Sequence, residues 1–589
     1  MLDVRMLFSA LVDADYLSSE AFEQSGMDMV YRTVGLVLQP EQNLRSLFDH
    51  VAGLAQTTKA SADMLAMRAD LLGACLNAGG RSPGAYALAA PTGSGKTIAM
   101  LAFALKHAQA HGLRRIIVVL PYLSIIDQTV KEYRKILNDS GAGYIIEDDS
   151  LARDVGKEES SVRQLAQNWD APVIVTTTVR FFESLFSNRP MDCRKLHRIA
   201  NSIVLFDEAQ TLPPLLAAPT IAALSHLIGR YSCSVVFSTA TQPAFETIAD
   251  KAKQLCGISW QPAAVAPNSL GLFQHTRRVE VCYVPEPQPW EGIAAQIRTE
   301  QQSLAIVNMK RHARALYGMV KGGEDNNAFH LTTSMCPQHR RDKLQTVRDR
   351  LGKGLSCHLI ATQCVEAGVD IDFPVLWRAL APLDSLCQAA GRCNRNGSAQ
   401  LGRMTVFNPV QSGKERLYPD DTYQNAAQLV HEMSVTSGWP DIFDPAVIKD
   451  YYLKLYSLQQ NFRDRSRTIQ EMDNAILTQD FPEVSKLYRW IQQYASSIVV
   501  PYHGAMEVYN YLSEAADRGE VNRAWFTHAR KITVGEAINR ETASFGWLKP
   551  IKKGREVVDG WYILLPESGL YNDDIGLDMG DKTNFPSAL

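Results

Sequence analysis

The sequence lacks the cysteine pattern of a zinc-binding protein. Its 10 cysteines occur singly, with no Cys-x-x-Cys pair and no Cys/His ligand spacing. This absence argues against zinc and favours a reducing compartment. The longest apolar runs, such as IIVVL, have the length of a β-strand and are too short to span a membrane. The N-terminus has no basic region followed by an apolar stretch and a cleavage site, so we expect a cytoplasmic protein.

An excess of charge of one sign is also missing. The chain has 60 Lys and Arg against 63 Asp and Glu, a net charge of -3. It is therefore not a generally basic protein, and any contact with nucleic acid must come from a local groove. We find no internal repeat. At 589 residues, the chain is too long for one hydrophobic core, and about 150 residues per domain predicts three or four domains.

Short β-branched runs alternate with helical stretches between residues 85 and 410. This alternation predicts an α/β fold with two parallel sheets in tandem lobes. One series of strands comprises AYALAA (85–90), RRIIVVLP (114–121), APVIVTTT (171–178), SIVLFDE (202–208) and CSVVFSTAT (233–241). The other comprises SLAIVNMK (303–310), AFHLTTS (328–334), CHLIATQ (357–363), VLWRALA (375–381) and GRMTVFNP (402–409). Between them, residues 259–275 are rich in proline and small residues, which predicts a connector. Beyond residue 410, mixed helices and isolated strands predict an α+β accessory domain.

A helix is expected over residues 62–78, upstream of the first strand. Its spacing places five residues on one apolar face: Met64, Leu71, Leu72, Cys75 and Leu76. The glycines and proline of GGRSPG then end this helix before the first strand.

AAPTGSGKT, residues 89–97, matches the phosphate-binding loop of nucleotide-binding proteins, with Ala90 in place of the usual first glycine. Gly93 and Gly95 let backbone amides surround the phosphates, Lys96 reaches the β and γ oxygens, and Thr97 can bind magnesium. The alternative is a simple glycine turn that opens a helix. A strand before the loop and a helix after it disfavour that alternative. The predicted nucleotide ligands here are Thr92, Gly93, Ser94, Gly95, Lys96 and Thr97.

SIVLFDEAQ, residues 202–210, supplies a second part of the site. An apolar strand delivers Asp207 and Glu208 at its C-terminal end, where open α/β sheets bind ligands. We expect Asp207 to hold Mg²⁺ and Glu208 to polarise the attacking water. An Asp-Glu pair after a strand is usually a solvated turn. Together with the phosphate loop, it indicates a magnesium-nucleotide site.

QAAGRCNR, residues 388–395, closes the second series. We expect Arg392 and Arg395 to lie three apart on a helix and so to share a face. Guanidinium groups from a second lobe can stabilise charge on the γ-phosphate. The alternative is a basic helix face on the surface. With the phosphate loop present, we expect the two lobes to close on one nucleotide.

The order of the motifs resembles the full series of superfamily 2 helicases: APTGSGKT, PYLSIIDQT, VIVTTTVRFFESLF, FDEAQ, STAT, HLTTSMCPQHR, ATQCVEAGVD and QAAGRCNR. More narrowly, PYLSIIDQT, FDEAQTLP, STATQP, FHLTTSMCPQHR and LDSLCQAAGRCNRNG resemble the type I CRISPR-associated helicase-nuclease family, nearest to its subtype I-C form. The resemblance implies two RecA-like lobes that use ATP and Mg²⁺ to move along single-stranded DNA, in the 3′-to-5′ direction. It also implies recruitment by a crRNA-guided surveillance complex of the Cascade type.

The resemblance implies roles for further residues of the motor. Gln210 stands where many relatives carry aspartate or histidine and joins the catalytic set. The motif that links hydrolysis to lobe movement contains Thr239, Ala240 and Thr241. The second-lobe motif begins with Thr362 and Gln363 on the DNA backbone and is completed nearer the nucleotide by Gly368 and Asp370, with Gln388 also placed at the nucleotide.

Other polar and aromatic residues have competing interpretations. Thr177 and Thr178 resemble residues that contact the DNA backbone, although threonine is also common in strands. Phe181 and Phe182 are expected in the core rather than stacked on bases. His330 and His339 are expected to be ordinary or phosphate-near residues. Core positions in the accessory domain are expected for Trp525, Trp547 and Trp561.

The opening helix, RMLFSALVDADYLSSE (5–20), has two interpretations. As an amphipathic helix it would bury Met6, Leu7, Leu11 and Ala14 and leave its acids solvated. In the family, an HD nuclease domain precedes the motor, and its last helix has the pattern Ala-Asp-x-x-x-Ser. This pattern matches Ala14, Asp15 and Ser19, which makes Asp15 a vestigial metal ligand and Asp13 incidental.

The resemblance thus predicts a remnant nuclease helix over residues 1–25. It predicts a helical linker over 26–80, lobe 1 over 81–275 and lobe 2 over 276–412. A linker and C-terminal accessory domain are expected over 413–589. Because only one histidine, His50, precedes the phosphate loop, we expect this chain alone to cut no DNA unless a separate HD nuclease domain is supplied.

Two alternatives to a DNA helicase remain from the motifs. Phosphate-backbone motifs distinguish DNA from RNA poorly, so an RNA helicase fits them as well. A nucleotide-binding switch without translocation is disfavoured because a binder needs neither a water-activating acid nor second-lobe arginines.

Overall fold

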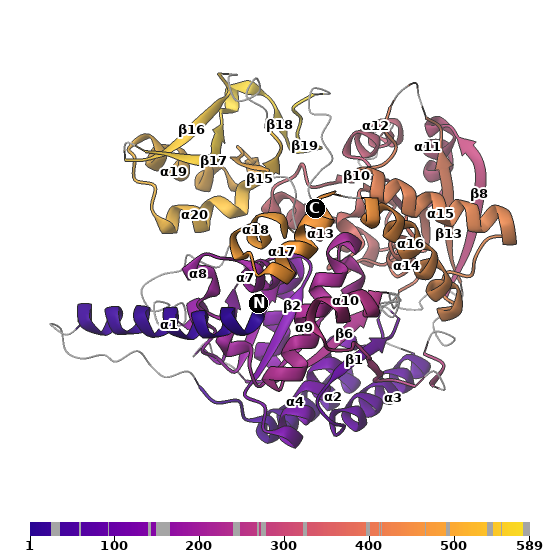
Figure 1. Ribbon diagram of the computed structural model, residues 1–589. Coiled ribbons are helices and arrows are strands. Elements are labelled where there is room, and N and C mark those ends of the chain that lie inside the picture. Colours follow the sequence, from indigo (N-terminus) through magenta and orange to yellow (C-terminus); the bar gives the residue numbers. More distant parts are fainter. Residues whose placement is uncertain are drawn as a thin grey trace. The chain divides into compact units, whose positions relative to one another are not determined.

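The computed structural model describes residues 1–24, 36–57, 61–91, 93–138, 143–148, 165–239, 248–267, 270–272, 278–321, 327–395, 401–411, 413, 415–465, 467–489, 495–538, 546–554 and 556–580. The chain divides into two compact units (Figure 1). Unit 1 comprises Met1–Thr276 and Phe443–Trp490, and unit 2 comprises Arg277–Ile442 and Ile491–Leu589. No described helix is long and apolar enough to cross a membrane.

Unit 1 contains a seven-stranded parallel sheet with the order β3-β4-β2-β5-β6-β1-β7. The five predicted strands are β1 (Ala85–Ala89), β2 (Arg115–Leu120), β4 (Val173–Thr177), β5 (Ser202–Phe206) and β6 (Ser234–Thr239). Two edge strands are additional, β3 (Ile145–Asp148) and β7 (Ala263–Ala264). The strand β7 lies inside the expected connector, whose Trp260 and Val265 are buried. Part of the expected connector therefore packs against lobe 1.

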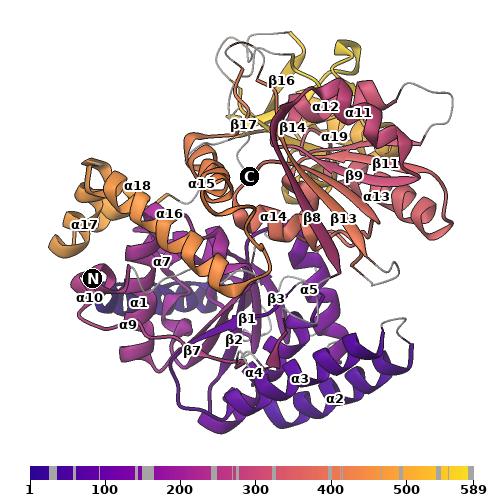
Figure 2. The ribbon, with the colours of Figure 1, turned by 90° about the vertical axis from the view of Figure 1, so that its right-hand side faces the viewer.

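The helices of unit 1 include the segment before the first strand. They are α1 (Leu2–Gln24), α2 (Pro40–Thr57), α3 (Ala62–Gly79), α4 (Lys96–His111), α5 (Leu123–Ile136), α7 (Thr178–Phe186), α8 (Pro190–Cys193), α9 (Ala217–Tyr231) and α10 (Ala249–Cys256). Both α2 and α3 lie beside α4 (Figures 1 and 2). The predicted apolar face of α3 is confirmed, because Met64, Leu71 and Cys75 are buried and Leu72 and Leu76 pack against the same core. The two helices are therefore part of the core of lobe 1.

A later segment of the chain also belongs to unit 1, in contrast to the predicted division at residue 413. It forms α16 (Pro445–Arg465), α17 (Arg467–Thr478) and α18 (Phe481–Leu487). Just after α18, the ring of Tyr488 stacks on Phe186 with centroids 3.8 Å apart. Its hydroxyl lies 2.7 Å from the Thr220 hydroxyl on α9. These buried contacts tie the segment to lobe 1.

Unit 2 contains a six-stranded parallel sheet with the order β10-β11-β9-β12-β13-β8 (Figure 2). Its strands are β8 (Val279–Gln288), β9 (Gln302–Ile306), β10 (Ala328–Leu331), β11 (Cys357–Ala361), β12 (Val375–Ala379) and β13 (Gly402–Pro409). Its helices are α11 (Trp290–Thr299), α12 (Lys310–Val320), α13 (Pro337–Gly352), α14 (Leu383–Ala390) and α15 (Asp421–Ser437). Every strand except β8 was predicted. The α/β fold with two parallel-sheet lobes is thus confirmed.

A mixed four-stranded sheet completes unit 2, with the order β15-β14-β17-β16. Its elements are β14 (Ser496–Val499), α19 (Met506–Asp517), α20 (Arg523–Ala529), β15 (Thr533–Glu536), β16 (Leu548–Lys553) and β17 (Glu556–Leu564), followed by the hairpin β18 (Tyr571–Asn572) and β19 (Gly576–Leu577). Trp525 is wholly buried and packs edge-on against Trp561. Trp547 is 46% exposed. The predicted core role is therefore wrong for Trp547.

The opening helix α1 packs with the opposite face from the one its apolar pattern predicts. Met6 is buried, as expected, but Leu7 is 73% and Leu11 is 68% exposed, and Ala14 is exposed as well. Asp13 is only 3% exposed. The expectation is therefore wrong for Leu7, Leu11 and Asp13, whereas Asp15 is exposed as expected.

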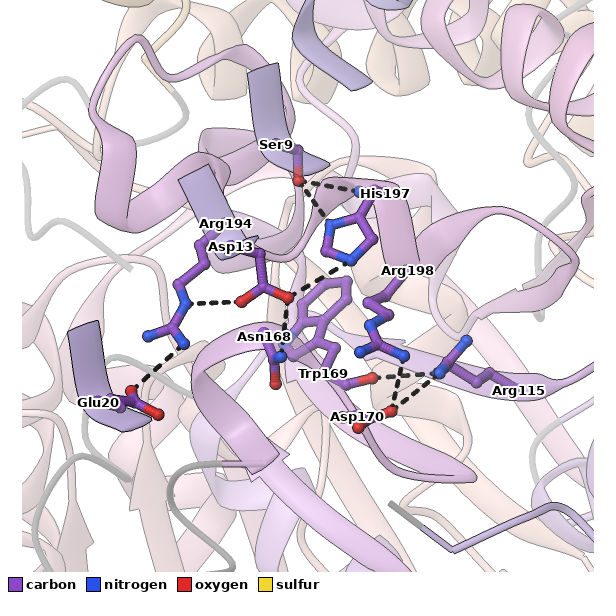
Figure 3. A network of polar contacts seen from close by, with 10 residues as sticks. All are labelled: Ser9, Asp13, Glu20, Arg115, Asn168, Trp169, Asp170, Arg194, His197 and Arg198. Carbon is purple, nitrogen blue, oxygen red and sulfur yellow. Dashed lines mark hydrogen bonds and ion pairs between the residues drawn. The ribbon is translucent and has the colours of Figure 1, made fainter. Parts of the chain in front are cut away.

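Polar anchors explain this orientation (Figure 3). The Asp13 carboxylate accepts hydrogen bonds from Arg194 Nε at 2.8 Å and Asn168 Nδ2 at 3.0 Å, and His197 Nε2 lies 3.5 Å from it. One turn earlier on the same face, the Ser9 hydroxyl accepts a hydrogen bond from the backbone N–H of His197. Asp13 thus holds α1 against lobe 1 and is not incidental.

Substitutions of the two aspartates of α1 are expected to lower the stability of the protein by different amounts. Asp13→Ala leaves the buried Arg194 guanidinium without its main partner, which is expected to cost about 3 kcal/mol. Asp15→Ala removes an exposed carboxylate and should change stability by about 0.5 kcal/mol or less. Hydrogen exchange of the α1 amides measures the local opening free energy of each variant. Equal protection of α1 in both variants would contradict the anchoring role of Asp13.

Candidate active site

Three strand ends of unit 1 converge because β6 lies between β5 and β1 in the sheet. Ala89 at the end of β1 is in register with Thr239 at the end of β6, and the Ala90 N–H donates to the Thr239 carbonyl. The phosphate loop follows β1, and the Asp-Glu pair follows β5. Parallel strands place their carboxyl ends at one sheet edge. The fold therefore gathers the phosphate loop, the acidic pair and Thr239 at that edge.

The phosphate loop has the backbone and the buried donors that a phosphate group requires. Gly93 and Gly95 have φ angles of 81° and 82°, in the left-handed region that favours glycine. Ser94 Oγ and Lys96 Nζ are buried and have no hydrogen-bond partner among the described residues. A buried donor without an acceptor is costly, so this pair fits a phosphate group. Thr92 lies outside the described residues.

Arg68 on α3 supports the loop and was missed by the sequence analysis. Its Nε donates to the Gly93 carbonyl at 3.2 Å. A Cβ atom at Gly95 would lie 3.5 Å from Arg68 Cγ, so the side chain passes directly beside the loop. Nothing in the sequence connects this residue with a loop 25 positions downstream.

The acidic pair at the end of β5 is connected to β6 by hydrogen bonds. Burial raises the pKa of Asp207 to about 6, while the Lys96 ammonium opposes the rise. Glu208 has a φ of 54°, which is unusual for a residue other than glycine and is often found at functional sites. Its carboxylate accepts a hydrogen bond from Gln210 Nε2 at 2.6 Å, and the Thr239 hydroxyl donates to Gln210 Oε1.

This chain of contacts connects the predicted water-activating acid to the predicted coupling motif. Lys96 and Asp207 interact electrostatically, and Glu208, Gln210 and Thr239 form one hydrogen-bonded series. The donor set suits Mg²⁺, because the Asp207 carboxylate and the Thr97 hydroxyl are hard oxygen ligands. Ala240 and Thr241, the rest of the coupling motif, lie outside the described residues.

The raised pKa of Asp207 predicts a pH-dependent magnesium requirement. As pH falls through about 6, a proton competes with Mg²⁺ for the carboxylate. Between about pH 7.5 and about pH 5.5 the ionised fraction falls about fourfold. We expect the Mg²⁺ concentration for half-maximal ATP hydrolysis to rise by a similar factor. Magnesium titrations at the two pH values measure this shift, and an unchanged midpoint would contradict the raised pKa.

The predicted DNA contacts of lobe 1 lie where β4 meets α7. The Thr177 hydroxyl caps α7 by accepting a hydrogen bond from the Arg180 N–H at 3.0 Å, and both Thr177 and Thr178 are mostly buried. The cap uses the oxygen of Thr177 and leaves its proton for donation. Phe181 and Phe182 are buried in the core, as predicted.

The second-lobe motif follows β11. Thr362 precedes a short 3-10 turn, Gln363–Val365, and Gly368 has a φ of 70°. Gln388 lies buried on α14. His330 is also buried, which lowers its pKa to about 3. His339 is enclosed by Tyr571 and Asp573, so both histidines are ordinary interior residues.

The expected helix carrying Arg392 and Arg395 is not observed. The helix α14 ends at Ala390, and the backbone of Arg392 and Asn394 then pairs with Phe373. Those hydrogen bonds replace the helical ones, so the two arginines do not share a helix face. Arg392 is buried and donates to the carbonyls of Val365 and Glu366.

Arg395 is placed differently. Its guanidinium pairs with the exposed carboxylate of Asp370 at 3.0 Å, and its backbone N–H donates to Asp372. Unit 2 therefore brings together the two arginines and the predicted nucleotide motif around Gly368 and Asp370.

The comparisons with known proteins agree with this geometry. Residues 56–249 match the DEAD/DEAH box helicase family. This match supports an ATP-dependent helicase enzyme, as the motifs predict. Residues 299–398 match the C-terminal family of the CRISPR-associated nuclease/helicase Cas3. The resemblance to CRISPR-associated helicase-nucleases that the motifs predict is thus confirmed as a similarity.

Two curated relatives carry the same description, CRISPR-associated nuclease/helicase Cas3. The Haloferax volcanii protein is 24% identical over 462 residues, covering 60% of this chain and 49% of the relative. The Methanothermobacter thermautotrophicus protein is 24% identical over 401 residues, covering 65% of this chain and 46% of the relative. The chain thus spans about half the length of these relatives.

Solved structures support the fold. The crystal structure of T. fusca Cas3 superposes with a TM-score of 0.65 at 16% identity, covering 94% of this chain and 72% of that chain. A chain of a CRISPR RNA-guided surveillance complex in a pre-nicking state superposes with a TM-score of 0.50 at 17% identity. The superposition covers 77% of this chain and 58% of that chain.

Proposed function

We propose that this chain is an ATP-driven translocase that moves 3′-to-5′ along single-stranded DNA and unwinds target DNA in type I CRISPR interference. The observation that carries the proposal is the site of unit 1. Its buried Lys96 ammonium, which has no hydrogen-bond partner in the described part of the chain, interacts electrostatically with Asp207. Glu208 is hydrogen-bonded through Gln210 to Thr239. The match to the Cas3 type supplies the biological setting.

The residues divide the work of ATP hydrolysis. Lys96 and the amides of the phosphate loop compensate the phosphate charge, and Asp207 with Thr97 would hold Mg²⁺, which supplies further charge neutralisation. Glu208 orients and polarises the attacking water. Loss of the γ-phosphate changes the environment of Glu208, and the Gln210–Thr239 hydrogen bond passes this change to the coupling motif at the end of β6.

The contacts to DNA are assigned to both lobes. Thr177 and Thr178 in lobe 1, with Thr362 and Gln363 in lobe 2, would hold the DNA backbone. Because such contacts replace counterions on phosphates, affinity for DNA should fall steeply with salt.

ATP turnover with single-stranded DNA, with RNA and without polymer tests the proposal. We expect single-stranded DNA to stimulate ATP turnover and RNA to leave it unchanged. Stimulation by RNA would instead support an RNA helicase, and equal turnover in all three samples would support a nucleotide switch. A DNA affinity that does not change with salt would contradict binding through the backbone.

The proposed partner is a crRNA-guided surveillance complex of the Cascade type, in the cytoplasm. The superposition on a chain of such a complex supports this partner at the level of the fold. A DNA-loaded surveillance complex should stimulate the ATPase of this chain more than free DNA does. Equal rates with loaded and unloaded complexes would contradict recruitment.

We further propose that the 589 residues of this sequence do not cut DNA by themselves, because only one histidine, His50, precedes the phosphate loop. Asp15 remains the predicted vestigial metal ligand, and it lies on the exposed face of α1, opposite the Asp13 anchor. Purified chain with ATP and divalent metals should leave DNA intact. Metal-dependent cutting by this chain alone would overturn this part of the proposal.

A further inference from the structure

Arg378 is a wholly buried arginine on β12 that no motif of the sequence identifies. Its Nε lies 2.8 Å from the Glu366 carboxylate, which is itself almost completely buried. An ion pair of this kind is rare, because two charges leave water and a pair of apolar side chains would pack as stably. Its retention in a parallel-sheet core therefore suggests a role in fixing geometry.

The guanidinium of Arg378 uses its remaining donors on two further elements. Nη1 donates to Asn308 Oδ1 at 2.7 Å, just after β9, and Nη2 donates to the Tyr423 hydroxyl on α15 at 2.8 Å. Tyr423 in turn donates to Asn308 Oδ1 at 3.2 Å. We call Arg378, Glu366, Asn308 and the partly exposed Tyr423 the buried hub.

The buried hub holds the turn that carries the predicted DNA contacts. The strand β9 lies between β11 and β12, so Asn308 stands beside the turn that follows β11. The Asn308 carbonyl accepts a hydrogen bond from Gln363 Nε2 at 3.2 Å. From the other side, Arg392 donates to the carbonyls of Val365 and Glu366. Residues 363–366 are thus held by the side chains of Arg378 and Arg392 and by the backbone of Asn308.

The charges of the hub depend on one another. Burial raises the pKa of Glu366 to about 7, and the Arg378 guanidinium opposes this rise. Removing Arg378 would leave a buried carboxylate that either takes up a proton or moves toward water. Either change would displace the turn and Gln363 with it.

We propose that Arg378 is a positioning residue for DNA-stimulated ATP hydrolysis, which acts by holding the Gln363–Glu366 turn in its DNA-binding geometry through Glu366 and Asn308. This inference rests on the proposed function. Arg378 itself touches neither nucleotide nor DNA, because it is wholly enclosed by unit 2.

Three variants separate positioning from folding. Arg378→Met breaks the ion pair. The double variant Arg378→Met/Glu366→Met removes both charges, which usually restores the stability lost by breaking a buried pair. Tyr423→Phe keeps the volume and every charge and removes only the hydroxyl that accepts from Arg378. Arg403→Met is the matched control, since Arg403 lies on the neighbouring strand β13 and pairs with Glu300 at 2.9 Å near the surface.

The readouts are the single-stranded DNA concentration that gives half-maximal ATPase stimulation and the affinity for a fluorescent ATP analogue. We expect the DNA concentration to rise about tenfold or more in the single and double Arg378 variants and about threefold in Tyr423→Phe. ATP-analogue affinity should stay within about twofold in all variants, and Arg403→Met should match the wild type.

The inference would be overturned if the double variant and Tyr423→Phe both needed the wild-type DNA concentration for half-maximal ATPase stimulation. The buried hub would then contribute to packing alone. If DNA fails to stimulate the wild type, the proposed function itself fails, and this inference with it. The wild-type sample therefore distinguishes the two failures.

Discussion

Lys96→Ala and Glu208→Gln are both expected to lower ATP turnover by about a thousandfold or more, yet to differ in ATP binding. Lys96→Ala removes a buried ammonium that has no hydrogen-bond partner among the described residues, so the phosphate charge loses its compensation and affinity should fall. Glu208→Gln keeps the side-chain shape and removes the charge that polarises water. ATP should still bind to it.

Turnover assays and equilibrium binding of a fluorescent ATP analogue measure both effects. Lys106→Ala is the matched control for the lysine, because Lys106 lies on the same helix and hydrogen-bonds only to Gln109 among the described contacts. Glu147→Gln, on β3 and paired with Arg134, is the control for the acid. Tight ATP binding by Lys96→Ala together with lost binding by Glu208→Gln would contradict the assigned roles.

Arg395→Ala should also lower ATP turnover by about a thousandfold, because the resemblance assigns this guanidinium to the γ-phosphate. Its ion pair with Asp370 is partly exposed, so the free energy of unfolding should change by about 1 kcal/mol or less. Arg392→Ala should lose activity as well. Since Arg392 is buried and holds the Val365–Glu366 carbonyls, it should in addition lose about 2 kcal/mol of stability.

Parallel ATPase and thermal-unfolding measurements distinguish the two arginines. Arg403→Ala serves as the control, because Arg403 also forms a partly exposed ion pair in unit 2, with Glu300. Retained turnover in Arg395→Ala, or equal stability of the two arginine variants, would contradict this division of roles.

The sequence predicted the parts of the fold that depend on local pattern. Buried parallel strands are continuous apolar runs, so most strands of both lobes could be read directly. The short edge strands β3 and β7 could not, because β3 (IIED) has only two apolar residues and β7 has only two residues in all. The phosphate loop and the Asp-Glu pair were found because their spacing is dictated by phosphate chemistry, which folding context does not change.

Long-range polar contacts account for the errors. The orientation of α1 follows from Asp13 and Arg194, two residues 181 positions apart, and no local periodicity encodes such a pair. The helix α14 ends at Ala390 because the residues after it form an isolated β-bridge between Cys393 and Phe373. Arg68 and the buried hub were missed for the same reason, since each acts through partners brought together only by the sheet order. Which charged side chains are buried, and against which partners, is therefore what the sequence predicted least well.

Strand separation tests the central claim most directly. A DNA duplex with a 3′ single-stranded tail, incubated with the chain, ATP and Mg²⁺, should separate into single strands, while a 5′-tailed duplex should remain paired. Lys96→Ala should separate neither. Separation of the 3′-tailed duplex without ATP hydrolysis, or ATP turnover that never separates strands, would contradict an ATP-driven DNA motor.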